Sequence, residues 1–375
     1  MATAGATPLL LGLPDEIVIW EILVRLNPKS ILRCRAVCRA WRHATSTRSF
    51  LLAHHGRQPN LPIICVGRNF LAFDHRAACD HLHTVAQLDA SFDLEASCDG
   101  LLVLSKRSTT DTCFFVCNPA THEHALLGRA RDLDIMGMYP HRPTGEYRLL
   151  LHRRTQRRWM AADLLPEGEI GCYIFTLGSD QPPRYIGWPE IYPSYFNPLV
   201  LVRDNLHWDP SLFQDEGKPI VFDTQAEMFR EMRAPITPSN SYIFETHGTL
   251  GIYNRVKRDG KTEIVDIWVL QDYECEVWDF KYRIELPVAE IRGRFEGSDS
   301  FWFMNLVSVE GDMLLLVSFG QWLLHIDSDG RLVESFHRDG EGRHSLTGFL
   351  LKQTLVPHTF FTALEGYAVN GSPFI

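Results

Sequence analysis

The stretch between residues 13 and 50 constrains the fold more than any other part of the chain. From Ile17 to Leu26 the only polar residues are Glu21 and Arg25. A short helix that is apolar nearly all round has no face to leave in water, so it must be covered on more than one side. The stretch is also only about forty residues long, near the size below which a chain struggles to bury enough surface by itself. Either the rest of the chain or another protein must therefore cover it. Because the later sequence offers no obvious helix for this purpose, another protein is the better explanation.

Local signals predict three short helices in this stretch. Pro14 and the two acidic residues after it suit the first turn of a helix that runs to about Leu26. Asn27 then resembles an N-cap that precedes a proline at the first position of a second helix, 28–35. In that helix Ile31 and Leu32 are expected to turn inward. A third helix carries apolar residues at i, i+4 and i+7 spacing, namely Val37, Trp41 and Ala44.

The charge and the cysteines of the chain indicate its partners and its compartment. The formal net charge is −9, but residues 13–50 carry +4 and the remainder −13, which suggests an acidic partner for the basic stretch. The odd number of cysteines, nine, their wide scatter and the lack of a signal peptide or membrane span predict reduced thiols and an intracellular protein, cytoplasmic or nuclear. Cys79 with His81 and His83, and Cys113 with Cys117, lack a second pair at zinc spacing, so no metal is expected.

From about residue 61 the pattern changes to short apolar or alternating runs separated by turn residues, which is typical of an all-β domain. The clearest unit is 96–127, where Asp99-Gly100 and Asn118-Pro119 mark turns between strands. Four further four-strand groups follow, starting near residues 133, 199, 242 and 302. The remaining strands, 62–67, 70–74 and 82–88 near the start with 346–351 near the end, complete a sixth group.

These groups recur every 40–60 residues, which suits the blades of a β-propeller. Pairing of the first strands with the last would close the ring and remove its exposed edges. We therefore expect a small all-α unit followed by a propeller of six blades, with seven or eight blades, or an array of β-sandwiches, as alternatives. The expected division is a flexible tail at 1–12, a helical unit at 13–50 and a propeller-like domain at 61–375.

The helical unit resembles an F-box in the order and spacing of many positions. The residues that carry the resemblance are Leu13-Pro14, Ile17, Ile22, Leu26, Pro28, Leu32, Arg33, Val37-Cys38, Trp41-Arg42 and Phe50. Asn27 before Pro28 departs from the leucine that many members have there. The rest of the chain is similar to the propeller-type, kelch-like F-box-associated β domain of plant F-box proteins. That resemblance rests on 99–102, 117–121, 145–147, 205–208 and 345–361.

The resemblance implies a partner and a role. An F-box docks on a Skp-type adaptor, which links it to a cullin in a ubiquitin ligase, and the β domain then holds a target protein for ubiquitination. The positions that would contact the adaptor are Leu13, Pro14, Ile17, Leu32, Val37, Cys38 and Trp41. Such a substrate-recognition subunit is not an enzyme. Two alternatives stay open: a propeller-type enzyme or carbohydrate-binding protein that the helices merely cap, and an F-box protein acting outside the ligase.

Other candidate sites are weaker. The chain has no G-x-S-x-G, H-E-x-x-H or P-loop signature, so no catalytic residue and no cofactor is assigned. Arg153, Arg154, Arg157 and Arg158 beside Trp159 could hold phosphate, but the surrounding domain is acidic and no nucleic-acid or membrane partner is expected. A segment rich in proline and aromatic residues is a candidate target-binding loop, through Tyr185, Trp188, Tyr192, Tyr195 and Phe196.

Overall fold

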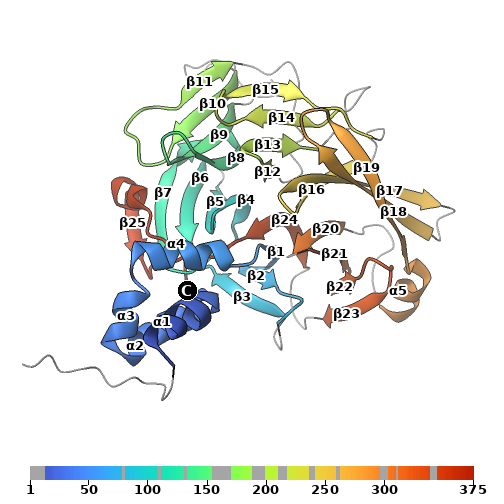
Figure 1. Ribbon diagram of the computed structural model, residues 1–375. Coiled ribbons are helices and arrows are strands. Elements are labelled where there is room, and N and C mark those ends of the chain that lie inside the picture. The colour runs from blue at the N-terminus through green and yellow to red at the C-terminus, as the bar shows by residue number, and fades with distance from the viewer. Residues whose placement is uncertain are drawn as a thin grey trace, which may run out of the picture.

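The computed structural model describes twelve segments of the 375-residue chain. They are 13–77, 81–108, 111–130, 133–153, 170–187, 199–209, 218–235, 241–258, 262–295, 303–309, 311–337 and 344–375. Figure 1 shows blades arranged in a ring, with helices α1 to α4 beside it. The expected fold class, a short helical unit followed by a six-bladed β-propeller, is confirmed.

Each blade is an antiparallel sheet built largely from strands that are consecutive in the chain. The first contains β24 (Ser345–Leu351), β1 (Leu61–Val66), β2 (Asn69–Phe73) and β3 (Leu82–Gln87). The second contains β4 (Asp93–Cys98), β5 (Leu101–Arg107), β6 (Thr112–Asn118), β7 (Glu123–Ala130) and β25 (Glu365–Val369). The third contains β8 (Leu133–His141), β9 (Glu146–Arg153), β10 (Gly171–Thr176) and β11 (Arg184–Gly187).

The other three blades have four strands each. The fourth contains β12 (Val200–Val202), β13 (Asn205–Trp208), β14 (Ile220–Asp223) and β15 (Met228–Glu231). The fifth contains β16 (Ser241–Thr246), β17 (Thr249–Arg258), β18 (Thr262–Asp272) and β19 (Val277–Leu286). The sixth contains β20 (Phe303–Val309), β21 (Asp312–Phe319), β22 (Trp322–Ile326) and β23 (Leu332–His337). Outside the blades lie α5 (Val288–Arg294) and the 3₁₀ helix η3 (Thr359–Ala363).

The ring closes through pairing of distant segments. Strand β24 pairs antiparallel with β1, with Ser345 opposite Cys65 and Leu351 opposite Leu61, as the sequence predicted. The C-terminal segment then does something that the sequence did not predict. Strand β25 adds to the outer edge of β7, which makes the second blade five-stranded. The outer edge of that blade is therefore covered by the chain itself.

The predicted Asp99-Gly100 turn between β4 and β5 is present and requires glycine. Gly100 has a φ of +86°, in the region that L-residues with side chains rarely adopt. A Cβ atom at this position would also lie 2.5 Å from the carbonyl oxygen of Lys352. The turn therefore packs closely against the segment that follows β24.

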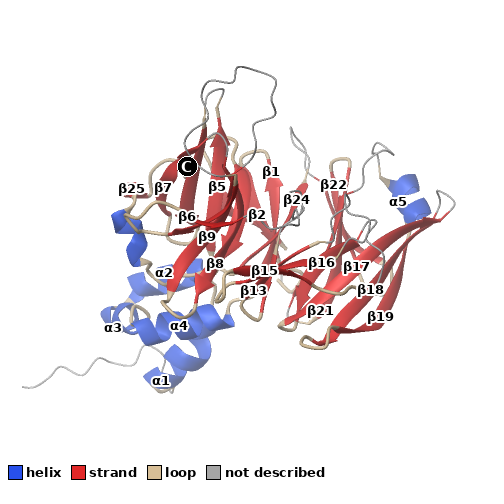
Figure 2. Ribbon diagram, turned by 90° about the horizontal axis from the view of Figure 1, so that it is seen from above, coloured by secondary structure: helices blue, strands red, loops and turns tan. Residues whose placement is uncertain are grey.

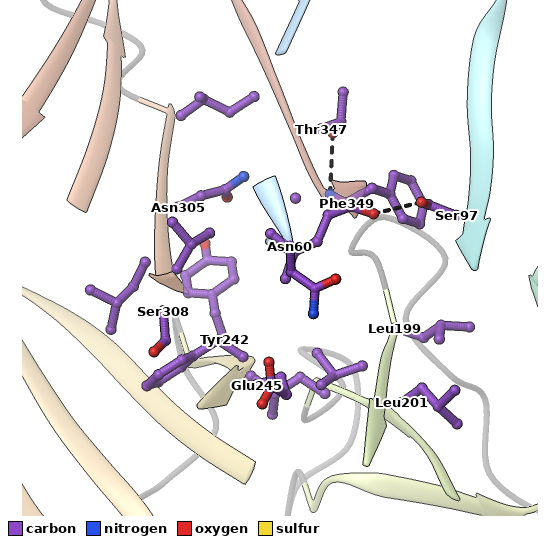
Figure 3. Close-up of a pocket in the computed structure, with 18 of the residues that line it drawn as sticks. Asn60, Ser97, Leu199, Leu201, Tyr242, Glu245, Asn305, Ser308, Thr347 and Phe349 are labelled. Carbon is purple, nitrogen blue, oxygen red and sulfur yellow. Dashed lines mark hydrogen bonds between the residues drawn. The ribbon is translucent and has the colours of Figure 1, made fainter. Parts of the chain in front are cut away.

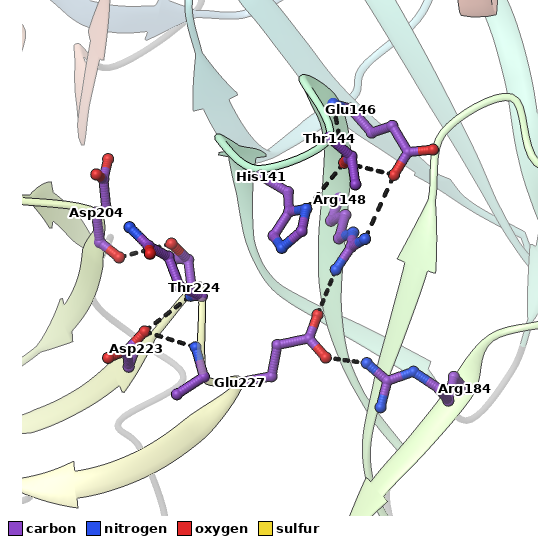
Figure 4. A network of polar contacts seen from close by, with 11 residues as sticks. His141, Thr144, Glu146, Arg148, Arg184, Asp204, Asp223, Thr224 and Glu227 are labelled. Carbon is purple, nitrogen blue, oxygen red and sulfur yellow. Dashed lines mark hydrogen bonds and ion pairs between the residues drawn. The ribbon is translucent and has the colours of Figure 1, made fainter.

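Most of the core lies between neighbouring blades. Between the fifth and sixth blades, for example, Val265 and Ile267 pack in one cluster with Leu315 and Leu324. Polar networks bridge other seams. In Figure 4 the carboxylate of Glu227 in the fourth blade contacts Arg148 and Arg184 of the third, with 2.6 Å between Glu227 Oε1 and Arg148 Nη1. Arg148 and Glu227 are largely buried, so their charge-assisted hydrogen bond fixes the relative orientation of the two blades in addition to the apolar packing.

Three features of the described segments concern membranes, metals and disulfides. None of the helices in those segments is long and apolar enough to cross a membrane. No cluster of His, Cys, Asp or Glu side chains within the described part of the chain could hold a metal ion. The eight cysteines that the structure describes are all unpaired.

The buried His207 makes stability depend on pH. Its Nδ1 lies 3.2 Å from the carbonyl oxygen of Val200 and its Nε2 lies 2.8 Å from the hydroxyl of Tyr273, so the neutral ring is fully bonded. Burial lowers the pKa of His207 to about 4. The unfolded chain, with a histidine pKa near 6.5, therefore takes up this proton before the folded chain does.

We expect His207 to reduce the free energy of unfolding as the pH falls from about 6.5 to about 4, by roughly 3 kcal/mol at the lower end. The His207→Gln variant removes this term, so its free energy of unfolding should fall less steeply over that window. Urea denaturation at a series of pH values measures both slopes. The exposed His43, changed to Gln, is the control. Parallel slopes for the His207 variant and the unaltered protein would contradict the prediction.

Candidate functional site

The helical head comprises residues 13–57 and has well-defined helix starts. A continuous helical stretch is formed by α1 (Asp15–Ile17), the π-helix η1 (Val18–Ile22) and the 3₁₀ helix η2 (Leu23–Arg25). Helix α2 (Pro28–Val37) begins as predicted, because Asn27 Oδ1 accepts a 2.8 Å hydrogen bond from the backbone N–H of Ser30. Its end lies two residues beyond the predicted 35.

The next two helices start with side-chain caps as well. At the start of α3 (Arg39–Ala44), the sulfur of Cys38 accepts a hydrogen bond from the N–H of Trp41 at 3.4 Å. Helix α4 (Arg48–Arg57), which the sequence did not predict, starts with a cap from Thr47. Helix α4 spans most of the residues between the expected units 13–50 and 61–375.

The propeller completes the core of the head. Six residues of the head form a buried apolar cluster: Val18, Leu23, Val24, Ile31, Phe50 and Leu51. Leu355, which follows β24 in the chain, belongs to the same cluster, and Ala120 and Val356 of the propeller pack against it. The propeller therefore covers part of the excess apolar surface that the sequence predicts for residues 17–26.

Polar contacts of α4 reinforce this junction. His54 Nε2 lies 2.8 Å from the carbonyl oxygen of Leu26, at the end of the first helical stretch. Burial lowers the pKa of His54, so the ring stays neutral in this position. His55 Nδ1 lies 3.3 Å from the carbonyl oxygen of Gln353, and Lys352 Nζ donates to the carbonyl of Gly56 at 3.3 Å. Helix α4 thus joins the head to the ring; Figure 2 shows the head against one face of the ring.

Asp99 connects this junction to the second and third blades. Its carboxylate lies 3.8 Å from His55 Nε2 of α4 and accepts a 3.0 Å hydrogen bond from the hydroxyl of Tyr147 in β9. Burial alone would raise the pKa of Asp99, but these two partners outweigh it, so the pKa is below its usual value. The carboxylate therefore stays ionised between the head and the ring.

The apolar surface that remains uncovered on the head includes most of the predicted adaptor contacts. Leu13, Pro14, Ile17, Leu32 and Val37 are exposed, the four nonproline side chains by 40–57%. Leu32 does not turn inward as predicted, whereas its neighbour Ile31 is fully buried. Cys38 and Trp41 are half-buried, and Trp41 packs against the core of the head.

Two further exposed residues belong to this surface. Trp20 and Ile22 are 39% and 41% exposed. Sequence reasoning left Trp20 out and named Ile22 as an F-box position but not as an adaptor contact, although the all-round apolarity of 17–26 was a signal for both. We call the set Leu13, Ile17, Trp20, Ile22, Leu32 and Val37 the apolar face of the head. An apolar set of this size on a basic unit is unusual for a surface that meets only water.

The candidate loop on the propeller is only partly described. Tyr185 lies on β11, is 40% exposed, and its ring packs 5.2 Å from that of Tyr173. Trp188, Tyr192, Tyr195 and Phe196 lie outside the described residues, as do Arg154, Arg157, Arg158 and Trp159. The structure therefore tests neither predicted cluster.

Comparison with known proteins assigns both parts of the chain. Residues 10–54 match the model of the F-box-like family. Residues 69–318 match the model described as the F-box associated beta propeller domain, which covers well over half of the chain. The chain belongs to the F-box associated β-propeller family. The resemblance on which the sequence analysis rested is thereby confirmed.

Individual relatives agree with this assignment. Two F-box proteins of Arabidopsis thaliana, At5g49610 and At5g65850, are each 24% identical to this chain. The matches cover 73% of this chain in both cases, and 79% and 71% of the respective relatives. Among solved structures, a chain of a nidogen/laminin complex is 10% identical with a TM-score of 0.46, over 76% of this chain and 96% of that one.

The junction predicts a specific effect of changing Leu355. Its side chain is 5% exposed within the head core of this F-box protein, so Leu355→Ala should reduce the free energy of unfolding by about 2–5 kcal/mol. We expect the loss to appear first as faster amide hydrogen exchange in residues 15–57. Leu324→Ala, between the fifth and sixth blades, is the matched control and should accelerate exchange there instead. Equal protection of the head in both variants would show that Leu355 does not hold it.

Proposed function

We propose that this chain is the substrate-recognition subunit of a cullin-based ubiquitin ligase. The apolar face of the head docks on a Skp-type adaptor, and the propeller holds a target protein. The observation that carries the proposal is that a head matching the F-box-like family leaves Leu13, Ile17, Leu32 and Val37 exposed although the propeller covers its other side. The predicted contacts Pro14, Cys38 and Trp41 border this surface or support it.

The mechanism in this role is proximity. The chain makes and breaks no bond; it holds the target near a ubiquitin-charged enzyme that the cullin recruits, which raises the effective concentration of the target there. The contacts of α4 with Lys352 and Gln353 support this mechanism, because a head fixed to the ring defines the distance over which ubiquitin must be transferred. The role also implies an intracellular protein.

The arrangement of the strands favours one face of the ring for the target. The face next to α4 carries the short turns Asp99-Gly100, Arg203-Asp204 and His247-Gly248. Strands β9 and β11 end at the opposite face, and the chain runs from Arg153 to Gly171 and from Gly187 to Val200 before the next strand that the structure describes. Long connections are where binding surfaces are commonly built. We therefore assign the target to the face opposite the head.

Adaptor docking is tested by placing charge on the apolar face of the head. The double variant Leu32→Asp, Val37→Asp should weaken binding of a purified Skp-type adaptor by roughly 100-fold or more, because two exposed apolar contacts become buried carboxylates. Isothermal titration calorimetry on the full chain measures the affinity. These positions are better choices than Trp41, whose truncation would also disturb the head core.

The matched control is Leu52→Asp. Leu52 is 48% exposed on α4 but is not one of the predicted contacts, so its variant should bind the adaptor as the unaltered protein does. Both variants should keep the melting temperature of the unaltered protein. Retained affinity in the double variant would refute docking through this face. Adaptor binding without cullin association would favour an F-box protein acting outside the ligase, and turnover of a small molecule with no adaptor binding would favour a propeller enzyme.

A further inference from the structure

The centre of the ring contains a cavity of about 800 Å³. Its wall comes from all six blades, through the innermost strands β4, β8, β12, β16, β20 and β24. Asn60, between α4 and β1, also lines it, and Figure 3 shows its side chain between Tyr242 on one side and Leu199 on the other. The volume lies within the range of small-molecule sites in proteins, roughly 300–1,000 Å³.

The wall is rich in uncharged hydrogen-bonding groups. Consecutive residues line the cavity, for example 199–203, 303–308 and 345–350. Side chains of consecutive strand residues point to opposite faces of the sheet. A strand whose consecutive residues all line the cavity therefore presents its edge, not one face, to the cavity. Each of the six strands pairs with a neighbour on one side only. Backbone N–H and C=O groups on the other edge therefore face the cavity and need partners.

The acidic groups of the wall already have partners. Asp209 accepts a 2.5 Å hydrogen bond from the N–H of Ile243, and Glu245 accepts one of 2.7 Å from the N–H of Gly248. Asp99 is bonded to Tyr147 and lies beside His55, as described above. Each of these carboxylates is therefore already held in place by a donor of the protein.

The basic groups are engaged in the same way. Arg255 pairs with Glu263 at 2.5 Å, and Lys352 donates to the carbonyl of Gly56. The guanidinium of Arg203 lies over the ring of Tyr273, 5.3 Å from its centroid. The wall carries three carboxylates and three cationic side chains, so it has no excess of one charge to attract a charged ligand.

Three uncharged side chains of the wall are left for a ligand. Within the described part of the chain, the amide of Asn60 and the hydroxyls of Tyr242 and Ser345 form no side-chain hydrogen bond to another residue, and all three line the cavity. The ring of Tyr242 stacks on that of Tyr253, with 5.2 Å between centroids and 26° between planes, which holds its hydroxyl in place. Amide and hydroxyl groups match the alternating donors and acceptors of a polyhydroxylated molecule.

We propose that the central cavity binds an uncharged polyhydroxylated small molecule of the size of a sugar or cyclitol. The cavity is also close to the junction with the head. Asn60 directly follows the segment that carries α4, and the lining residues Asp99 and Lys352 both contact α4. A bound polyol therefore touches the residues that hold the head on the ring. This site is independent of adaptor docking, so either inference can fail alone.

The test uses the full chain and a panel of defined probes: myo-inositol, glucose, galactose, sucrose and trehalose as neutral polyols, with glucuronate and inositol hexakisphosphate as charged counterparts. Saturation-transfer NMR measures binding. We expect at least one neutral probe to bind with a millimolar or tighter Kd and the charged counterparts to bind at least tenfold more weakly. Tyr242→Phe, which removes one hydroxyl and keeps the ring, should weaken that probe about fivefold.

Two further variants locate the site. Asn60→Trp places a large side chain in the cavity and should abolish binding, provided that thermal unfolding shows a folded protein. Tyr282→Phe removes a hydroxyl from a tyrosine 46% exposed on the outer strand β19 and should leave the affinity unchanged. Three results would each overturn the proposal: no neutral probe binds, the charged probes bind equally well, or the affinity is unchanged in both Tyr242→Phe and Asn60→Trp.

Discussion

The pairing of β24 with β1 is the interaction on which the rest of the molecule depends. It closes the ring, since Leu351 lies opposite Leu61, and it also sets the position of the head. The chain enters β1 directly from α4 and leaves β24 into residues 352–356, so the two segments that meet the head are neighbours across this one ladder. Leu355 enters the head core and Lys352 reaches Gly56. The pairing that closes the ring therefore also positions the two segments that attach the head.

This arrangement explains why an apolar helical unit of marginal size can be stable in this chain. A unit of about forty residues buries too little surface by itself, but Leu355, Ala120 and Val356 extend its core into the propeller. What they leave uncovered is the apolar face of the head. The charge of the chain favours this surface as well. Residues 13–50 carry +4 and the remainder −13, so an acidic partner is attracted to the head more than to the propeller.

Local signals in the sequence predicted local structure well. The Asn27 cap, the Asp99-Gly100 turn and five of the six strand groups depend on neighbouring residues, and all are present. The closing strand was predictable because unpaired edges are costly. Helix α4 and strand β25 were missed because their reasons are tertiary: α4 buries a histidine, His54, against the carbonyl of Leu26, and β25 is a short segment that gains order only against β7. Leu32 was placed inward together with Ile31. Apolar periodicity does not show which of these two adjacent residues the folded protein buries, and only Ile31 is buried.

The same limit applies to the candidate site. The sequence showed that residues 17–26 have more apolar surface than one face of a small unit can bury, and it indicated a missing partner rather than an internal neighbour as the cause. In the structure an internal neighbour covers some of these residues and leaves others exposed. Val18, Leu23 and Val24 face the internal neighbour, whereas Ile17, Trp20 and Ile22 remain exposed. A helix apolar all round is thus divided between the propeller and an open surface, and the residues fixed on the ring decide which side the proposed adaptor can reach. Because α4 holds that orientation, changes at Leu355 should affect adaptor binding without touching the adaptor.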